Sequence, residues 1–219
     1  MFCAAVAATM LTLPAAANAA KVYQQQSRWK SNVRYVDTGG ENNTVVAKVI
    51  MDGYGVLVTD STATITTVAP QDVSLSAQPC TVLDEHRALC VNPTPEPEEI
   101  GGFTYAFLDM SLGAGDNAFE LDRESIPPEE SISTAGGDDV ISTGRVVSAF
   151  VSDFDGSNTI RVGRTQRPVT VIGGRGPDRI DVKNGTGGDD VKCSWLDEIV
   201  AEGDRLQADR DDVIDADCG

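Results

Sequence analysis

The sequence of 219 residues predicts an all-β protein, and three observations support this class. Several segments alternate β-branched apolar residues with polar residues at period two, as half-buried strands do. Gly, Asp and Pro interrupt these segments at short intervals, and no stretch keeps a helical period. We expect a C-terminal parallel β-roll or β-helix-like solenoid, preceded by a small strand-rich N-terminal region.

Residues 1–19 have the features of a secretory signal peptide. The segment is apolar and uncharged, and it ends in the small-residue sequence Ala17-Asn18-Ala19. It is too short, and broken by Pro14, to make a good transmembrane span. We therefore predict export from the cell, an extracellular location and no membrane insertion.

Residues 20–92 form the predicted small β-rich region, with alternating segments such as NNTVVAKVIM, YGVLVTDS and ATITTV. The following segment, PTPEPEEIGG at 93–102, is rich in proline and glutamate, which disfavour both helix and central strand. We expect a linker over 93–102 and a separate repeat region over 103–219.

Four cysteines remain once the signal peptide, with Cys3, is removed. An even number suits an oxidising compartment, and none has the spacing of a zinc site. Of the three possible pairings we favour the local ones, Cys80 with Cys90 and Cys193 with Cys218. The first pair flanks an Asp-Glu-His-Arg tip, which predicts a hairpin closed by a disulfide.

A Gly-x-Asp/Asn-x-apolar motif recurs through residues 103–219. Its glycine-containing copies carry the polar residues Asn117, Asp138, Asn158, Asp178 and Asp189, and shorter copies carry Asp197, Asp204 and Asp211. A step of about twenty residues suits one full coil of a solenoid, and about eleven suits half a coil. The first four loops should then stack along one edge, with the apolar partners inside: Phe119, Val140, Ile160 and Ile180.

The composition of these loops favours a hard cation. Glycine turns carbonyl oxygens toward one point by adopting positive φ, and aspartate adds a carboxylate. Clustered oxygen ligands suit Ca²⁺ better than Mg²⁺, which demands a tight octahedron. The net charge of −17 also favours cations as partners and opposes binding to nucleic acid.

The segment GGRGPDRID at 173–181 matches the G-G-x-G-x-D-x-U-x nonapeptide and resembles the haemolysin-type, or RTX, calcium-binding repeat. Residues 184–192 match except for the first glycine, and 112–120 retain Gly113 and Gly115. The order of signal, small Cys-containing region and Gly/Asp repeats is similar to that of secreted bacterial calcium-binding proteins. The resemblance covers roughly half of the chain, without the strict tandem spacing of nine residues.

In that family the repeats form a parallel β-roll, and Ca²⁺ lies between loops of successive coils. The sixth-position aspartate and backbone carbonyls bind the ion. The resemblance therefore implies these Ca²⁺ ligands: Gly173, Gly174, Gly176, Asp178, Gly185, Gly187, Asp189, Gly136, Asp138, Asn117 and Asn158.

We expect an extracellular, non-enzymatic, calcium-binding structural or adhesion-type protein, whose partners are calcium ions and a cell-surface glycan or protein. The single histidine, His86, excludes HExxH chemistry, and no G-x-S-x-G motif occurs. One alternative is a metal-free scaffold in which Asp and Asn only hydrogen-bond turn backbones. Another is a calcium-dependent polysaccharide lyase that uses the arginines near the repeats: Arg161, Arg164, Arg167, Arg175 and Arg179.

Overall fold

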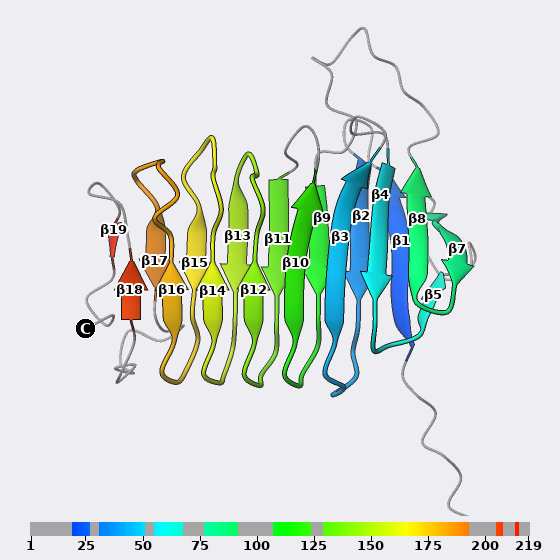
Figure 1. Cartoon of the computed structure of the whole chain (residues 1–219), viewed down its shortest axis with the longest axis horizontal. Coiled ribbons are helices and arrows are strands. Elements are labelled where there is room, and N and C mark those ends of the chain that lie inside the picture. The colour runs from blue at the N-terminus through cyan, green and yellow to red at the C-terminus, as the bar shows by residue number, and fades with distance from the viewer. Residues whose placement is uncertain are drawn as a thin grey trace, which may run out of the picture.

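The computed structural model describes residues 19–26, 31–50, 55–67, 77–91, 107–123, 129–192, 205–207 and 213–214. These residues form strands and turns and no helix, which confirms the all-β class (Figure 1). Among them, accordingly, no helix is long and apolar enough to cross a membrane. The predicted signal peptide up to Asn18, the linker at 93–102, and Cys193 and Cys218 lie outside the described residues.

The first of two sheets has ten strands. They are β1 (Ala20–Gln26), β2 (Ser31–Val36), β5 (Ile65–Thr67), β6 (Ala77–Pro79), β9 (Phe107–Ser111), β11 (Glu129–Ser133), β13 (Ala149–Ser152), β15 (Thr170–Ile172), β17 (Asp190–Lys192) and β19 (Val213–Ile214). Their order is β19-β17-β15-β13-β11-β9-β2-β1-β5, and β6 also pairs with β1.

The second sheet has nine strands. They are β3 (Thr44–Ile50), β4 (Gly55–Asp60), β7 (Thr81–Asp84), β8 (Arg87–Val91), β10 (Ala118–Arg123), β12 (Val140–Ser142), β14 (Thr159–Arg161), β16 (Arg179–Asp181) and β18 (Arg205–Gln207). Their order is β18-β16-β14-β12-β10-β3-β4-β8-β7.

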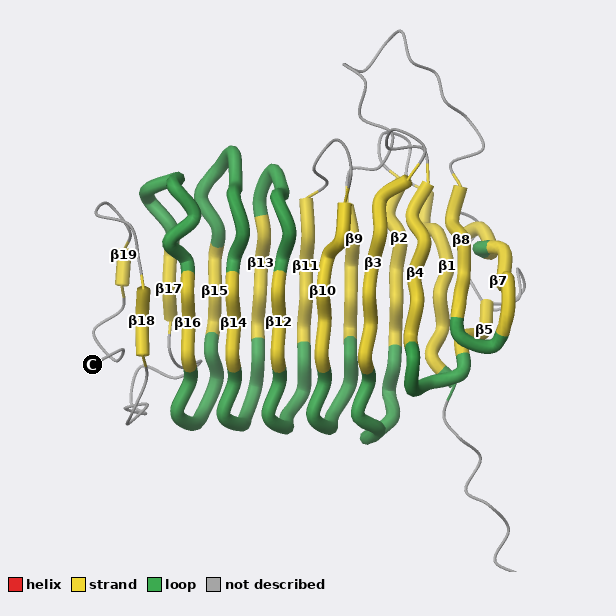
Figure 2. Tube along the Cα trace, viewed as in Figure 1, coloured by secondary structure: helices red, strands yellow, loops and turns green. Residues whose placement is uncertain are grey.

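From β9 to β17 the chain changes sheet after every strand. Each strand pairs in parallel with the strand two places further along the chain. The connecting loops therefore gather at two opposite edges of the molecule (Figure 2). We call the edge with the β9–β10, β11–β12, β13–β14 and β15–β16 loops the first edge, and the edge with the β12–β13, β14–β15 and β16–β17 loops the second edge.

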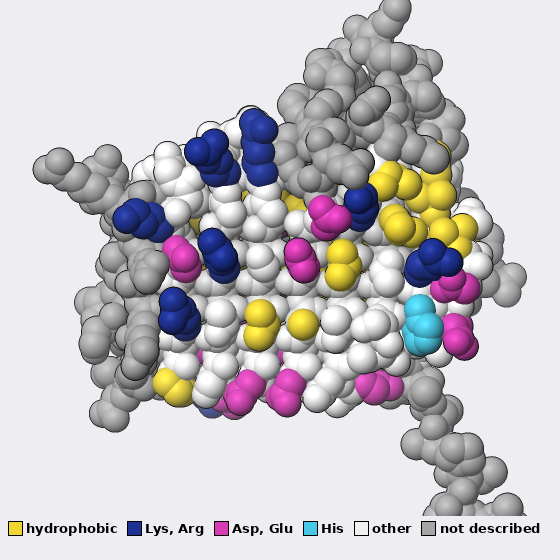
Figure 3. Space-filling view, viewed as in Figure 1, with side chains coloured by type: hydrophobic (Ala, Val, Ile, Leu, Met, Phe, Trp, Pro, Cys, Tyr) yellow, Lys and Arg dark blue, Asp and Glu magenta, His cyan; other side chains and the backbone are white. Residues whose placement is uncertain are grey.

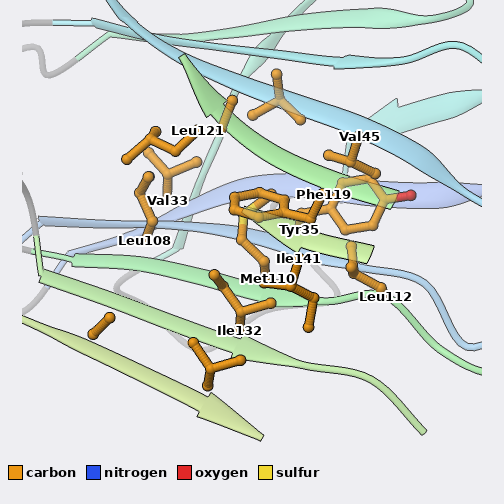
Figure 4. Packing of buried hydrophobic residues seen from close by; sticks show 14 of the residues in the cluster. Val33, Tyr35, Val45, Leu108, Met110, Leu112, Phe119, Leu121, Ile132 and Ile141 are labelled. Atoms are coloured by element: carbon orange, nitrogen blue, oxygen red, sulfur yellow. The ribbon is translucent and has the colours of Figure 1, made fainter. Parts of the chain in front are cut away.

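Apolar side chains between the two sheets form the core (Figure 4). Two columns in register fill it: Phe119, Ile141, Ile160 and Ile180 from the second sheet, and Met110, Ile132, Val151, Val171 and Val191 from the first. The prediction that Val140 lies in this core is wrong, because Val140 is 52% exposed and Ile141 takes its place. Since side chains alternate along a strand, an error of one residue reverses the face.

The N-terminal strands continue the same two sheets. β2 pairs in parallel with β9, and β3 with β10, so backbone hydrogen bonds join the N-terminal strands to the repeats in both sheets. Beyond this junction β4, β8 and β7 follow β3 in antiparallel order. β7 and β8 form the expected hairpin, and the Cys80–Cys90 disulfide is confirmed.

Candidate functional site

Four six-residue turns stack on one another at the first edge. Their sequences are LGAGDN at 112–117, TAGGDD at 134–139, DFDGSN at 153–158 and GGRGPD at 173–178. Strand register aligns the turns residue by residue, and the longer turn at 37–43 stacks beside the first of them. The fourth residue of every six-residue turn is glycine, and the sixth is Asp or Asn.

The glycine at the fourth position permits close stacking of the turns. Gly137 and Gly156 have φ of 115° and 134°, in the region that favours glycine. A Cβ on Gly156 would lie 1.8 Å from the carbonyl oxygen of Gly137, which belongs to the preceding turn. The backbone amide of Gly156 donates to the carbonyl oxygen of Arg175, in the following turn, at 2.8 Å. The glycines therefore serve backbone-to-backbone packing.

The sixth-position side chains form a buried ladder of hydrogen bonds. The backbone amide of Asn117 donates to Oδ1 of Asp139 at 2.7 Å. The amide of Asp139 donates to Oδ1 of Asn158 at 2.9 Å, and that of Asn158 to Oδ1 of Asp178 at 2.8 Å. Asn43 begins the ladder by donating to Oδ1 of Asn117 at 3.1 Å. Asp and Asn share this position because both provide the carbonyl-type oxygen that the neighbouring amide requires.

Asp138 lies outside this ladder, one residue before it. Its side chain is exposed, and its Oδ1 accepts a hydrogen bond from the amide of Ser157 at 2.8 Å. Asp139 occupies the aligned position, so the sequence alignment was displaced by one residue at this turn. Counting Gly-x-Asp-x-apolar from Gly137 instead of Gly136 gives the observed register.

Other predicted ligands at the first edge lie in the 173–178 turn. Gly173 leaves room for the buried carboxylate of Asp178, because a Cβ on this glycine would lie 2.7 Å from Asp178 Oδ2. Gly174 has φ of 88°, and Gly176 belongs to the fourth-position column. Gly136 lies in the 134–139 turn, where its carbonyl oxygen accepts the amide of Gly115 at 2.8 Å.

Asp189, with Gly185 and Gly187, lies at the second edge, away from the stacked turns. Oδ1 of Asp189 accepts the amide of Val169 at 2.9 Å, and Oδ2 accepts from Nδ2 of Asn184 at 2.7 Å. The structure therefore separates the two loops whose sequences superimpose, as expected for half a repeat. Like the ladder residues, Asp189 uses its side-chain oxygen to accept a backbone amide from the neighbouring repeat.

Asp139 and Asp153 form a buried pair of carboxyl groups that the repeat motif does not indicate. They come from neighbouring turns, each is 1% exposed, and the Thr134 hydroxyl lies beside both. Burial raises the pKa of both carboxyl groups, and the charge of Asp139 adds to the effect on Asp153, whose pKa rises to about 7. Two buried carboxylates side by side require a shared proton or a cation.

The residues around this pair fit a hard cation better than Asn117 does. Oδ2 of Asp139 and Oγ1 of Thr134 are fully buried and lack a hydrogen-bond partner with good geometry. In contrast, the amide oxygen of Asn117 accepts from Asn43, and its Nδ2 donates to the carbonyl oxygen of Gly115 at 2.7 Å. Neither polar atom of Asn117 is available to a metal ion.

The turn at 37–43 shows a hydrogen-bonded carboxylate in the same place. Asp37 holds the position in its turn that Asp153 holds in its own. Nδ2 of Asn43 donates to Oδ2 of Asp37 at 2.6 Å, and the Gly39 amide donates to Oδ1 at 2.8 Å. Asp153 likewise accepts from the backbone amides of Phe154 and Asp155, but the aligned Asn158 donates from Nδ2 to the carbonyl oxygen of Gly173 at 3.4 Å.

His86 lies in the β7–β8 hairpin turn. Its Nδ1 is 3.1 Å from the carbonyl oxygen of Ala63, and its Nε2 is 3.6 Å from Oε1 of Glu85. Among the described residues, no group of three or more His, Cys, Asp or Glu side chains is arranged to bind a metal ion. A cation at the first edge would therefore rely on the Asp139–Asp153 pair and neutral oxygens.

Comparisons with protein-family models, with curated proteins and with solved structures found no match to this chain.

Proposed function

We propose that the protein is an extracellular structural β-solenoid stabilised by Ca²⁺ held between the 134–139 and 153–158 turns. The observation that carries the proposal is the pairing of two buried carboxyl groups, Asp139 and Asp153, from consecutive turns. A divalent ion would neutralise both and connect the two turns. Burying a charged carboxylate costs free energy unless the charge is balanced. An ion bound between two buried carboxylates should therefore stabilise the folded state more than an ion bound to exposed carboxylates would.

Calcium is the ion that this ligand set favours. Asp139 and Asp153 supply charged oxygens, and Thr134 supplies a neutral one. Ca²⁺ accepts about six to eight such oxygens, some of them from water, in tolerant geometry, whereas Mg²⁺ demands a near-ideal octahedron. The resemblance of residues 173–181 to RTX repeats supports the same ion. The proposed site uses different residues, because Asp178 serves its turn through the ladder hydrogen bond.

Secretion and a non-enzymatic role complete the proposal. The Cys80–Cys90 disulfide favours an oxidising compartment. The protein would then act as a stiff extracellular module, with Ca²⁺ controlling how tightly the turns of the first edge pack.

Calorimetric titration of metal-free protein with CaCl₂ tests the proposal. We expect a binding heat that Asp139→Asn and Asp153→Asn each abolish. Asp138→Asn is the matched control, since it removes one charge from an exposed position of the same turn. Equal loss in Asp138→Asn and Asp139→Asn would indicate only diffuse attraction to acidic surface, and would reject the site.

The second candidate is a metal-free scaffold, and the ladder of hydrogen bonds from backbone amides to Asp and Asn oxygens favours it. In that case the Asp139–Asp153 pair keeps one proton, and the turns need no ion. The titration separates the candidates, because the scaffold predicts no calcium heat with the wild-type protein.

A further inference from the structure

Unpaired cationic side chains gather on one face of this acidic protein. They lie on the outer face of β14 and β16 and in the loops that follow β12, β14 and β16: Arg145, Arg161, Arg164, Arg179 and Lys183. We call these five residues the basic face. Figure 3 shows Lys and Arg side chains gathered over this part of the second sheet. All five are exposed, and within the described part of the chain none forms an ion pair.

Several cations elsewhere in the described chain are paired, although Lys21, Arg175 and Lys192 are not. Arg34 pairs with Asp109 at 2.7 Å, Lys48 with Asp122 at 3.4 Å, and Arg167 with Glu129 at 3.3 Å. On the basic face Asp181 lies opposite Arg161 and two residues after Arg179, and it forms no ion pair with either of them. The basic face therefore keeps its charge available for an external partner.

The basic face arises because the fold buries acidic side chains of this region and exposes its basic ones. Many acidic side chains between residues 129 and 192 are buried, most of them in the turns: Glu130, Asp139, Asp153, Asp178 and Asp189. The basic side chains of the same region are exposed. The local surface is consequently cationic, although the whole chain carries a net charge of −17.

We propose that the basic face binds a linear acidic polysaccharide through its carboxylate or sulfate groups. Parallel strands lie about 4.8 Å apart, and Arg161 and Arg179, diagonal to each other on neighbouring strands, present guanidinium groups on the same outer face. Guanidinium groups bind carboxylate and sulfate in a bidentate manner. An extended polymer with repeated anionic groups can cross these strands and contact several cations at once.

The same surface fits nucleic acid poorly. Single strands are usually bound through exposed aromatic residues, and the exposed phenylalanines of the described chain, Phe150 and Phe154, belong to β13 of the other sheet and the turn that follows it. The acidic remainder of the protein also repels a densely charged phosphate backbone. The proposal does not depend on calcium.

The test measures binding of the full chain to polygalacturonate and to heparin by calorimetry, with chelator present so that a failure of the calcium site has no influence. We expect binding that weakens with salt and that Arg161→Glu with Arg179→Glu reduces about tenfold or more. The control, Lys21→Glu with Lys192→Glu, makes the same charge change at exposed positions outside the face, and should reduce binding less than about twofold.

The milder pair Arg161→Gln with Arg179→Gln, checked by circular dichroism, separates loss of binding from loss of fold. Preference between the two polymers identifies carboxylate or sulfate as the recognised group. Equal losses in the charge-reversed and control pairs, tighter binding of a short DNA duplex, or no binding to either polymer would each overturn the proposal.

Discussion

The backbone amide of Asn158 donates a 2.8 Å hydrogen bond to Oδ1 of Asp178, which lies one turn further along the first edge. Both residues are buried, so the bond connects two turns without competition from water. Asp178→Ala should lower the free energy of unfolding by about 2–3 kcal/mol, because it leaves a buried amide without an acceptor.

Asp178→Asn is the matched control for this bond. Asparagine keeps an Oδ1 acceptor of the same shape, as Asn158 does one turn earlier, so we expect a change below about 1 kcal/mol in urea unfolding. A large loss in Asp178→Asn together with a small loss in Asp178→Ala would show that charge, and not the ladder bond, is the important property.

Gly156→Ala tests the packing of the fourth-position glycines. The new Cβ would lie 1.8 Å from the carbonyl oxygen of Gly137, so two turns must separate. We expect a loss on the order of 3 kcal/mol or failure to fold. Gly185→Ala also requires a positive φ, 84°, but has open space around the Cβ, and should lose about 1 kcal/mol. Thermal melts of both variants would detect the difference, and equal losses would rule out the contact as its cause.

The stacking of the first-edge turns could be predicted from sequence because the motif that marks each turn is local. The motif is a glycine, Asp or Asn two residues later, and an apolar residue two residues after that, and it recurs with every second strand. The copy that contains Asp189 comes after half a repeat, so it lies at the opposite edge. The alignment was displaced only at GGDD, where two glycines and two aspartates allow either register. Strand register shows that Asp139, and not Asp138, occupies the sixth position of this turn.

Two features could not be predicted from a local pattern. Asp153 precedes the motif of its own turn, and its importance comes from Asp139, which approaches it from the preceding turn. The pairing of β2 with β9 joins segments far apart in the chain, and neither segment encodes its partner. Contacts of this kind depend on how the turns stack, so they become visible only in three dimensions.

The raised pKa of Asp153 predicts a pH effect in calcium-free protein. The folded state holds a proton up to about pH 7, whereas the unfolded carboxyl group loses it near pH 4, so the folded state binds more protons between these values. Stability should therefore fall as pH rises through this range, by an amount on the order of 3 kcal/mol.

Asp153→Asn removes the titrating group and should flatten this part of the pH profile. Since the whole acidic chain also responds to pH, the informative quantity is the difference between wild type and variant in chelator, measured by urea unfolding. Parallel profiles for the two proteins would contradict the assignment to Asp153.

The Cys80–Cys90 disulfide should stabilise the N-terminal end of the sheets. It closes a loop with a sequence separation of 10, for which restriction of the unfolded chain contributes about 3 kcal/mol. We expect Cys80→Ala with Cys90→Ala to lose about this amount in urea unfolding under oxidising conditions. Reductant should destabilise the wild type and leave the double variant unchanged, and an effect of reductant on both would point to other cysteines.

Calcium should protect the first edge from hydrogen exchange. An ion that binds the folded state alone adds about 2.7 kcal/mol of stability at one hundred times its dissociation constant. The amides of residues 153–158 should slow most, because Asp153 begins this turn and Asp139 contacts it from the preceding one. Loops of the second edge, such as 184–189, should respond only as far as global stability rises. Protection that is uniform across both edges, or present in Asp153→Asn, would mean that calcium acts elsewhere on the chain.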